Sequence, residues 1–116
     1  MENPRVRIFS DELISGPVLS CGLALNGFSA EWASDGGLGA HGFDAAIVDL
    51  ESLGMRGYEI CRQVKRLGKQ LIIICNFNGD GTIACVLEAD YSLSKPFSMQ
   101  TMISIARELS RAGAAA

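Results

Sequence analysis

The sequence predicts an α/β protein in which a parallel five-stranded sheet is covered by helices on both faces. Short apolar runs alternate with amphipathic segments along the chain, which is typical of parallel strands joined by helical crossovers. The apolar run of residues 45–48 also ends at one carboxylate, that of Asp49. Open α/β sheets carry their functional groups at the C-terminal ends of such strands, so we expect chemistry at Asp49.

Five short runs are expected to form the strands of this sheet. They cover Val6–Ser10, Ala30–Ser34, Asp44–Leu50, Gln70–Cys75 and Tyr91–Leu93. The fourth run contains consecutive isoleucines, which suit a strand that is buried on both faces. The second run is the weakest strand candidate of the five.

Four segments are expected to be helical, and they cover Gly16–Asn26, Tyr58–Gly68, Thr82–Glu88 and Ser98–Ala112. Gly27 is a C-terminal stop for the first of them, and Ser98 is an N-cap for the last. Two of the helices carry an apolar face of helical period, formed by Ile60, Cys61, Val64 and Leu67 and by Met102, Ile105, Ala106 and Leu109. Residues 35–40 hold too much glycine for a stable helix, so the second helix of the fold is expected to be reduced or missing.

Length and composition indicate one small domain that binds neither nucleic acid nor membranes. The 116 residues are 48% hydrophobic and 20% charged, which is enough apolar material for one core. The net charge is -3 and the basic residues are scattered, so no basic patch is expected. The apolar stretches are too short to span a bilayer, and the N-terminus lacks the apolar core of a signal peptide. We expect a cytoplasmic domain at residues 1–112, followed by a tail or linker stub at 113–116.

The cysteines are expected to be reduced packing residues. They show neither CxxC nor Cys/His ligand spacing, and each falls within an apolar segment; they are Cys21, Cys61, Cys75 and Cys85. Disulfides are also rare in the cytoplasm. The sequence therefore predicts no metal or redox role for them.

Two motifs carry a resemblance that covers nearly the whole chain. Residues Asp49–Glu59 match without a gap a pattern of phosphoacceptor aspartate, a loop ending Gly-Met-Asp-Gly, and then an aromatic residue and glutamate. Residues Ala89–Phe97 look like the pattern Ala-Asp-Asp-Tyr-Leu-Thr-Lys-Pro-Phe. In this order the two motifs resemble the receiver domains of two-component response regulators, the CheY-like family. The resemblance implies a flavodoxin-like doubly wound sheet of strand order 2-1-3-4-5 and an atypical, single-domain member of the family.

Phosphoryl transfer to Asp49 is the chemistry that the resemblance implies. A carboxylate can act as nucleophile toward a phosphoryl group if the charge on the incoming oxygens is neutralised. Mg²⁺ prefers oxygen ligands, so Asp11 beside Asp49 is a sensible pair of ligands. The resemblance adds the Glu51 main-chain carbonyl as third protein ligand, and Ser10 could bind through a water.

Further roles follow from the resemblance for residues after the fourth and fifth strands. Lys95 would pair first with Asp49 and then with a phosphate oxygen, as a mobile point charge can. Asn76 would donate a hydrogen bond to the phosphoryl group. The bond between Lys95 and Pro96 is expected to be cis, an isomer that X-Pro bonds adopt at small cost.

The chain departs from the family pattern at four positions that bear on the site. Ser10 stands where receivers carry the first of two adjacent acids, which should weaken Mg²⁺ binding. A one-residue shift that makes Asp11 and Glu12 the pair stays open, although it places polar Ser10 in an inward strand slot. Bulky Phe77 replaces a small residue beside Asn76, which itself replaces the usual threonine or serine.

The fourth departure is that the segments between Asp35 and Phe43 and between Asn76 and Lys95 are shorter than usual in the family. The third departure concerns the element that transmits the signal. Ser92 occupies the position where the family has an aromatic residue that swings inward on phosphorylation. Tyr91 beside it should point to the opposite face of the strand. Serine has too little volume to fill or vacate a pocket, so the sequence predicts weak coupling between the site and the distant surface.

Two functions therefore compete for this chain. In the first it is a receiver that accepts phosphate on Asp49 from a histidine kinase or phosphotransfer protein and so changes its binding to a downstream protein partner. In the second it is a degenerate receiver that acts as an adaptor without phosphorylation. A separate enzyme is not expected, because a haloacid-dehalogenase-type phosphatase would need a second aspartate at Glu51. We expect a monomer or weak dimer.

Overall fold

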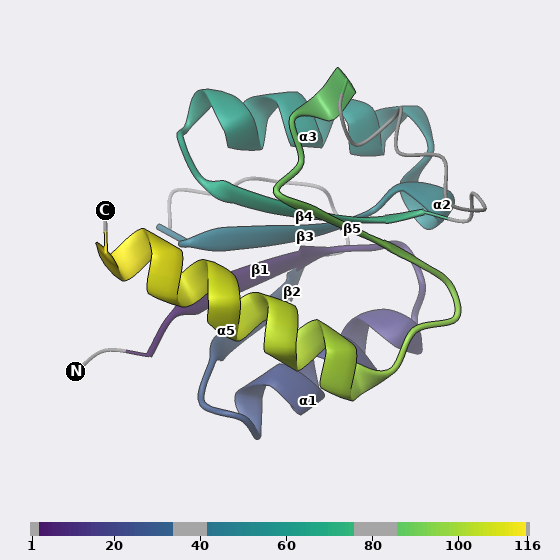
Figure 1. The fold of residues 1–116 in the computed structure, drawn as a ribbon. Coiled ribbons are helices and arrows are strands. Elements are labelled where there is room, and N and C mark those ends of the chain that lie inside the picture. The colour runs from purple at the N-terminus through teal and green to yellow at the C-terminus, as the bar shows by residue number, and fades with distance from the viewer. Residues whose placement is uncertain (1–2, 34–41, 76–85, 116) are drawn as a thin grey trace.

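The computed structural model describes residues 3–33, 42–75 and 86–115, with side chains through residue 109. These residues form a five-stranded, all-parallel sheet in the order β2-β1-β3-β4-β5 (Figure 1). The strands are β1 (Arg5–Phe9), β2 (Ser29–Ala33), β3 (Ala45–Asp49), β4 (Gln70–Cys75) and β5 (Tyr91–Ser94). The predicted class and strand order are confirmed, and the strand ends lie within one residue of the expected ones.

Helices cover both faces of the sheet, as the sequence predicts. They are α1 (Ser15–Ala24), α2 (Leu50–Leu53), α3 (Met55–Arg66) and α5 (Met99–Ala115). Figure 1 shows α1 and α5 together on one face and α3 on the other. The short α2 was not predicted, and it follows β3 directly. Among the described residues, none of these helices combines the length and apolar character that a membrane crossing needs.

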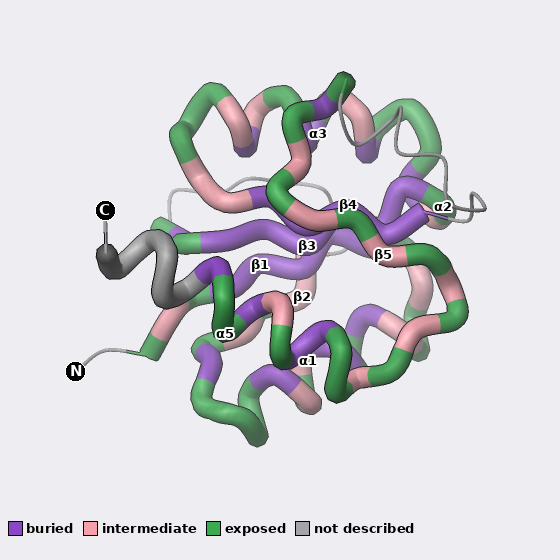
Figure 2. Tube along the Cα trace, in the orientation of Figure 1, coloured by how far each residue is buried: buried purple, intermediate pink, exposed green. Residues whose placement is uncertain are grey.

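The sheet separates two hydrophobic cores, and the central strands are buried on both faces (Figure 2). Ile72 and Ile74 of β4 point into the core that α1 and α5 cover, where Leu23 and Met102 are fully buried. The alternate residues Leu71 and Ile73 point into the core under α3, which also contains Val48, Phe9 and Val64. The isoleucine run thus serves both cores, because successive side chains of a strand face opposite sides.

Three details of the helices and cysteines differ from the expectation. Leu67 is 55% exposed, because it lies beyond the last residue of α3, where the chain turns toward β4. Cys21 is exposed, since the buried positions of α1 are Gly16, Leu19 and Leu23. The last helix continues to Ala115 rather than ending near Ala112.

The ends of two helices also differ, because α1 covers Ser15–Ala24 rather than Gly16–Asn26 and α3 covers Met55–Arg66 rather than Tyr58–Gly68. The cap of α5 and the role of Cys61 are as expected. The Ser98 hydroxyl accepts a hydrogen bond from the Thr101 backbone N–H at 3.1 Å, which is the N-cap predicted for α5. Burial raises the pKa of the Cys61 thiol to about 12, as suits a packing residue. The glycine-rich crossover at 35–40, most of the segment Thr82–Glu88 and Cys85 lie outside the described residues.

Candidate functional site

Asp49 is the last residue of β3 and one of the most buried charged groups of the chain. It is only 2% exposed. Its Oδ1 accepts a hydrogen bond from the Ser52 backbone N–H at 3.3 Å, so the side chain caps α2. Aspartate is a preferred N-cap residue, and this signal at Asp49 could have predicted the short helix from the sequence.

Lys95 follows β5 and returns to this carboxylate. Its Nζ donates to Asp49 Oδ2 at 3.0 Å and to Glu12 Oε1 at 2.6 Å, and it lies 3.5 Å from Glu51 Oε2. Burial of Lys95 opposes its charged form, but the hydrogen bonds to Glu12 and Asp49 outweigh that cost and raise the pKa of Lys95. The bond to Pro96 is cis, the isomer that the resemblance implies. The lysine is therefore a charged partner for three carboxylates.

Ser10 is completely buried and connects the first strand to the site. Its hydroxyl donates to Asp49 Oδ2 at 3.1 Å and accepts from the Glu12 backbone N–H at 3.1 Å. The Ser10 carbonyl accepts from the Trp32 indole N–H at 2.9 Å. Gly16 leaves room for that indole, because a Cβ there would lie 2.3 Å from Trp32 Nε1. The loop after β1 is thus held by β2 as well as by β3.

The two acids after Ser10 point to different partners. Asp11 forms hydrogen bonds with Arg56, and both carboxylate oxygens lie 2.8 Å from Nη2. Glu12 instead contacts Lys95, whose hydrogen bond holds the pKa of Glu12 below its usual value. The structure therefore places Glu12, and not the expected Asp11, beside Asp49, and it buries Ser10 as the open one-residue shift required. The role of Asp11 as a metal ligand stays a prediction.

Three carboxylates could hold a metal ion. One oxygen each from Glu12, Asp49 and Glu51 lies within 4.8 Å of the other two. Mg²⁺ takes such hard oxygen ligands, usually one or two carboxylates with waters, so the residues present fit this ion. Glu51 brings its side chain to the group, while the predicted use of its main-chain carbonyl stays untested.

A cleft of about 370 Å³ adjoins the nearly buried Asp49. Asp49 and Lys95 line it together with apolar residues of α1 and of the segment after β5, namely Val18, Leu19, Pro96, Phe97 and Met99. Two residues that were expected at the site, Asn76 and Phe77, lie outside the described residues.

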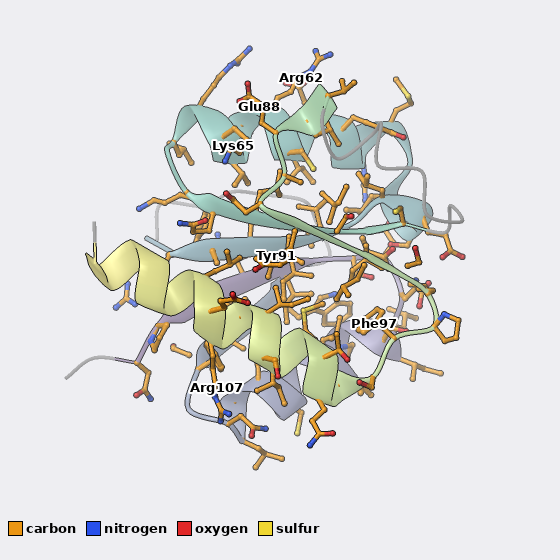
Figure 3. The ribbon with its side chains drawn as sticks, in the orientation of Figure 1. Arg62, Lys65, Glu88, Tyr91, Phe97 and Arg107 are labelled. Carbon is orange, nitrogen blue, oxygen red and sulfur yellow. The ribbon has the colours of Figure 1, made fainter. Side chains whose placement is uncertain are left out.

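The expected transmission residues lie on β5, one on each face. Ser92 is exposed, whereas Tyr91 is partly buried and packs against the core that α1 and α5 cover. Figure 3 shows Tyr91 between the sheet and α5. A hydrogen bond with Glu108 of α5 raises the pKa of the Tyr91 hydroxyl. The opposite orientation of the two residues is as predicted.

Comparisons with known proteins agree with this geometry. No family model matches the chain. It is 30% identical over 104 residues to the transcriptional regulatory protein QseB of Escherichia coli O157:H7, and the match covers 82% of this chain and 48% of that protein. It is 29% identical over 119 residues to the probable transcriptional regulatory protein SilR of Salmonella typhimurium, covering 94% and 52%. The chain spans about half the length of the curated relatives it matches.

Solved structures give the same fold. A CheY-like receiver domain protein from Methanospirillum hungatei JF-1 superimposes with a TM-score of 0.81 at 20% identity, over 95% of this chain and 96% of that one. A CheY-like receiver domain from Methylobacillus flagellatus does so with a TM-score of 0.78 at 22% identity, over 93% and 99%. Strand order, site geometry and these relatives agree, and the chain belongs to the response regulator receiver domains of two-component systems, the CheY-like family.

Proposed function

We propose that Asp49 accepts a phosphoryl group from a histidine kinase or phosphotransfer protein, in a Mg²⁺-dependent reaction, and that phosphorylation modulates binding to a downstream protein. The observation that carries this proposal is the 3.0 Å contact between Lys95 Nζ and the nearly buried Asp49 Oδ2. Lys95 holds the Asp49 carboxylate in place at the end of β3. After the transfer, its amine can move from the carboxylate to an oxygen of the bound phosphoryl group.

The transfer would convert a carboxylate into an acyl phosphate. An Asp49 oxygen forms a bond to phosphorus while the bond between phosphorus and the donor nitrogen breaks, and that electron pair leaves with the donor imidazole. The Ser10 hydroxyl and Lys95 Nζ, which both donate to Asp49 Oδ2, orient the carboxylate for this step. Near-complete burial limits the access of water to the product.

Glu12, Asp49 and Glu51 would hold the ion through their oxygens, with Asp11, Ser10 and the Glu51 carbonyl as further candidate ligands. A bound Mg²⁺ would neutralise charge on the phosphoryl oxygens. The carboxylates themselves have a second task, since they keep Lys95 at the site until the phosphoryl group arrives.

We favour this function over the degenerate adaptor because nucleophile, lysine and acids are in contact. An adaptor would not need a lysine that contacts both the buried Asp49 and Glu12. We expect a regulatory domain that turns over no separate substrate and works in the cytoplasm, as a monomer or weak dimer.

The test is labelling by a small phosphodonor such as acetyl phosphate with Mg²⁺, followed by intact-protein mass measurement. The wild-type chain should gain one phosphoryl group, and Asp49→Asn should gain none. Glu59→Gln, which removes an exposed carboxylate of α3, is the matched control and should label normally. Labelling that persists in Asp49→Asn would contradict the assignment of the acceptor, and a wild-type chain that never labels would favour the adaptor.

A further inference from the structure

Arg56, near the start of α3, contacts Asp11, which is one of the two acids after β1. This contact lies outside the group of carboxylates around Asp49. The Arg56 Nη2 atom lies 2.8 Å from each oxygen of Asp11. The two side chains are 54% and 43% exposed, so the contact lies at the mouth of the site rather than inside it. The Asp11 backbone N–H also donates to Ser52 Oγ at 3.0 Å, which fixes the residue from which this carboxylate projects.

Glu12, the neighbouring acid, lies within the site. Glu12 contacts Lys95 at 2.6 Å and belongs to the group of carboxylates that can hold a metal ion, whereas Asp11 does not belong to it. Two adjacent acids are therefore held by two different cations, Glu12 by Lys95 inside the site and Asp11 by Arg56 outside it. The two side chains start from neighbouring residues of one short loop, so a rearrangement of this loop at Asp11 could bring its charge inward.

We propose that Arg56 is a positioning residue that holds Asp11 away from the cation site and so lowers the affinity of this site for a divalent cation. The inference rests on the proposed function, because it requires that a cation binds beside Asp49. Asp11 lies outside the group of carboxylates that can hold the metal ion, so turning its carboxylate toward that ion would break the hydrogen bonds with Arg56. The Arg56 guanidinium, which contacts both oxygens of Asp11, therefore competes with the metal ion for this carboxylate.

The chain contains its own reporter of this loop. Trp32 is the single tryptophan, and its indole N–H donates to the Ser10 carbonyl at 2.9 Å, one residue before Asp11. A movement of the loop that turns Asp11 inward would change the surroundings of this indole. We therefore expect Trp32 fluorescence to change on Mg²⁺ binding without phosphorylation.

The experiment is a titration of the wild-type chain with Mg²⁺ alone, read by Trp32 fluorescence and by amide shifts in NMR spectra. Arg56→Gln should bind Mg²⁺ about two- to fivefold more tightly, which is the range expected for release from one exposed ion pair. In the Asp11→Asn background the same Arg56→Gln change should leave the affinity unaltered, because the arginine acts through Asp11. Circular dichroism checks that each variant is folded.

Arg62→Gln is the matched control for charge alone. Arg62 is an exposed arginine of the same helix and stands on its outer surface (Figure 3). Its substitution should change the Mg²⁺ affinity less than Arg56→Gln does. If Arg56→Gln raises the Mg²⁺ affinity equally in the wild-type and the Asp11→Asn backgrounds, the inference is overturned, and the gain reflects only the loss of one positive charge. Mg²⁺ binding that is the same in wild type and Arg56→Gln would overturn it while leaving the proposed function intact, and a silent titration in all variants would overturn both.

Discussion

The site at the ends of β1, β3 and β5 and the outer surface of β5 differ in how firmly their side chains are held. Asp49 is nearly buried and accepts hydrogen bonds from Ser10, Ser52 and Lys95. On β5, only a few residues before Lys95, Ser92 is exposed and too small to fill a pocket. The proposed capture of a phosphoryl group and the transmission of its arrival therefore depend on separate side chains of one fold. The side chains proposed for capture are in contact, whereas serine stands where the resemblance implies a transmitting aromatic residue.

The largest effect is expected at the site itself. Lys95→Met should lower the free energy of unfolding by about 1–3 kcal/mol, because it leaves nearly buried Asp49 without its cation next to two further acids. Urea denaturation without metal measures this effect. Added Mg²⁺ should restore part of the loss, since a cation again stands among the carboxylates.

Lys65→Met is the matched control for this variant. Its ion pair with Asp90 is longer, at 3.4 Å, and the Asp90 side chain is 30% exposed against 3% for Asp49. Asp90 also keeps a hydrogen bond of 2.7 Å from the Leu71 backbone N–H. The control should cost less than about 1 kcal/mol. Equal losses in the two variants would remove the contrast between a buried site and an ordinary surface pair.

The second effect concerns transmission and should be smaller. Beryllium fluoride with Mg²⁺ should shift amide signals near Asp11 and Asp49 but leave those around Tyr91 and Arg107 largely unchanged. Tyr91 is already fixed to α5 through Glu108, and Ser92 cannot change the free-energy gap between two arrangements by much. Partner affinity should then change by less than about tenfold, or ~1.4 kcal/mol.

A partner that binds only the phosphorylated form would contradict the predicted weak coupling between the site and the surface near β5 and α5. So would large beryllium fluoride shifts over the surface that carries Tyr91 and Arg107, which Figure 3 places beside and on α5. Either result would mean that a residue other than Ser92 transmits the signal. The Asp49→Asn variant is the negative control, because its NMR spectrum should not change when beryllium fluoride is added.

The smallest effect is a pH dependence at Glu12. The hydrogen bond from Lys95 lowers the pKa of Glu12 in the folded chain below the ordinary value of 4.5. A lowered pKa stabilises the fold above the ordinary value, and this stabilisation is lost as the pH falls through the lowered one. Glu12 is 36% exposed, so the contribution should be under about 1 kcal/mol.

Glu12→Gln tests this by urea denaturation at neutral and acidic pH. The variant should be less stable than the wild type at neutral pH, and the difference should shrink below the ordinary glutamate pKa. A difference that stays constant through the acid range would show that Glu12 contributes through packing rather than through its charge.

The strand order could be predicted from the resemblance to receiver domains, and the approach of Lys95 to Asp49 from strand ends that meet at one edge of a parallel sheet. The apolar run of β3 ends at Asp49, and the motif of residues 89–97 brings Lys95 back to the same edge of the sheet. Burial of the isoleucines followed from strand alternation in the same way.

The choice between adjacent acids could not be predicted, because it depends on side-chain rotation in a short loop. Asp11 and Glu12 have the same charge and lie one residue apart, and the partners that separate them, Arg56 and Lys95, come from distant segments. Burial of Ser10 counted against the shifted register from the sequence alone. In the structure Asp49, Glu12 and Ser52 satisfy the buried hydroxyl, so its burial carries little cost.

The link between Lys95 and Asp49 also fixes when the site can exist during synthesis of the chain. The two residues are 46 positions apart, and Ser10 lies 39 positions before Asp49. A nascent chain that has released β1, β3 and β4 from the ribosome therefore holds an acid cluster without its cation. The cluster gains its lysine only when β5 docks at the sheet edge, so closure of loops of this length must precede the ion pair. The site proposed to accept a phosphoryl group is therefore complete only after the last strand has joined the sheet.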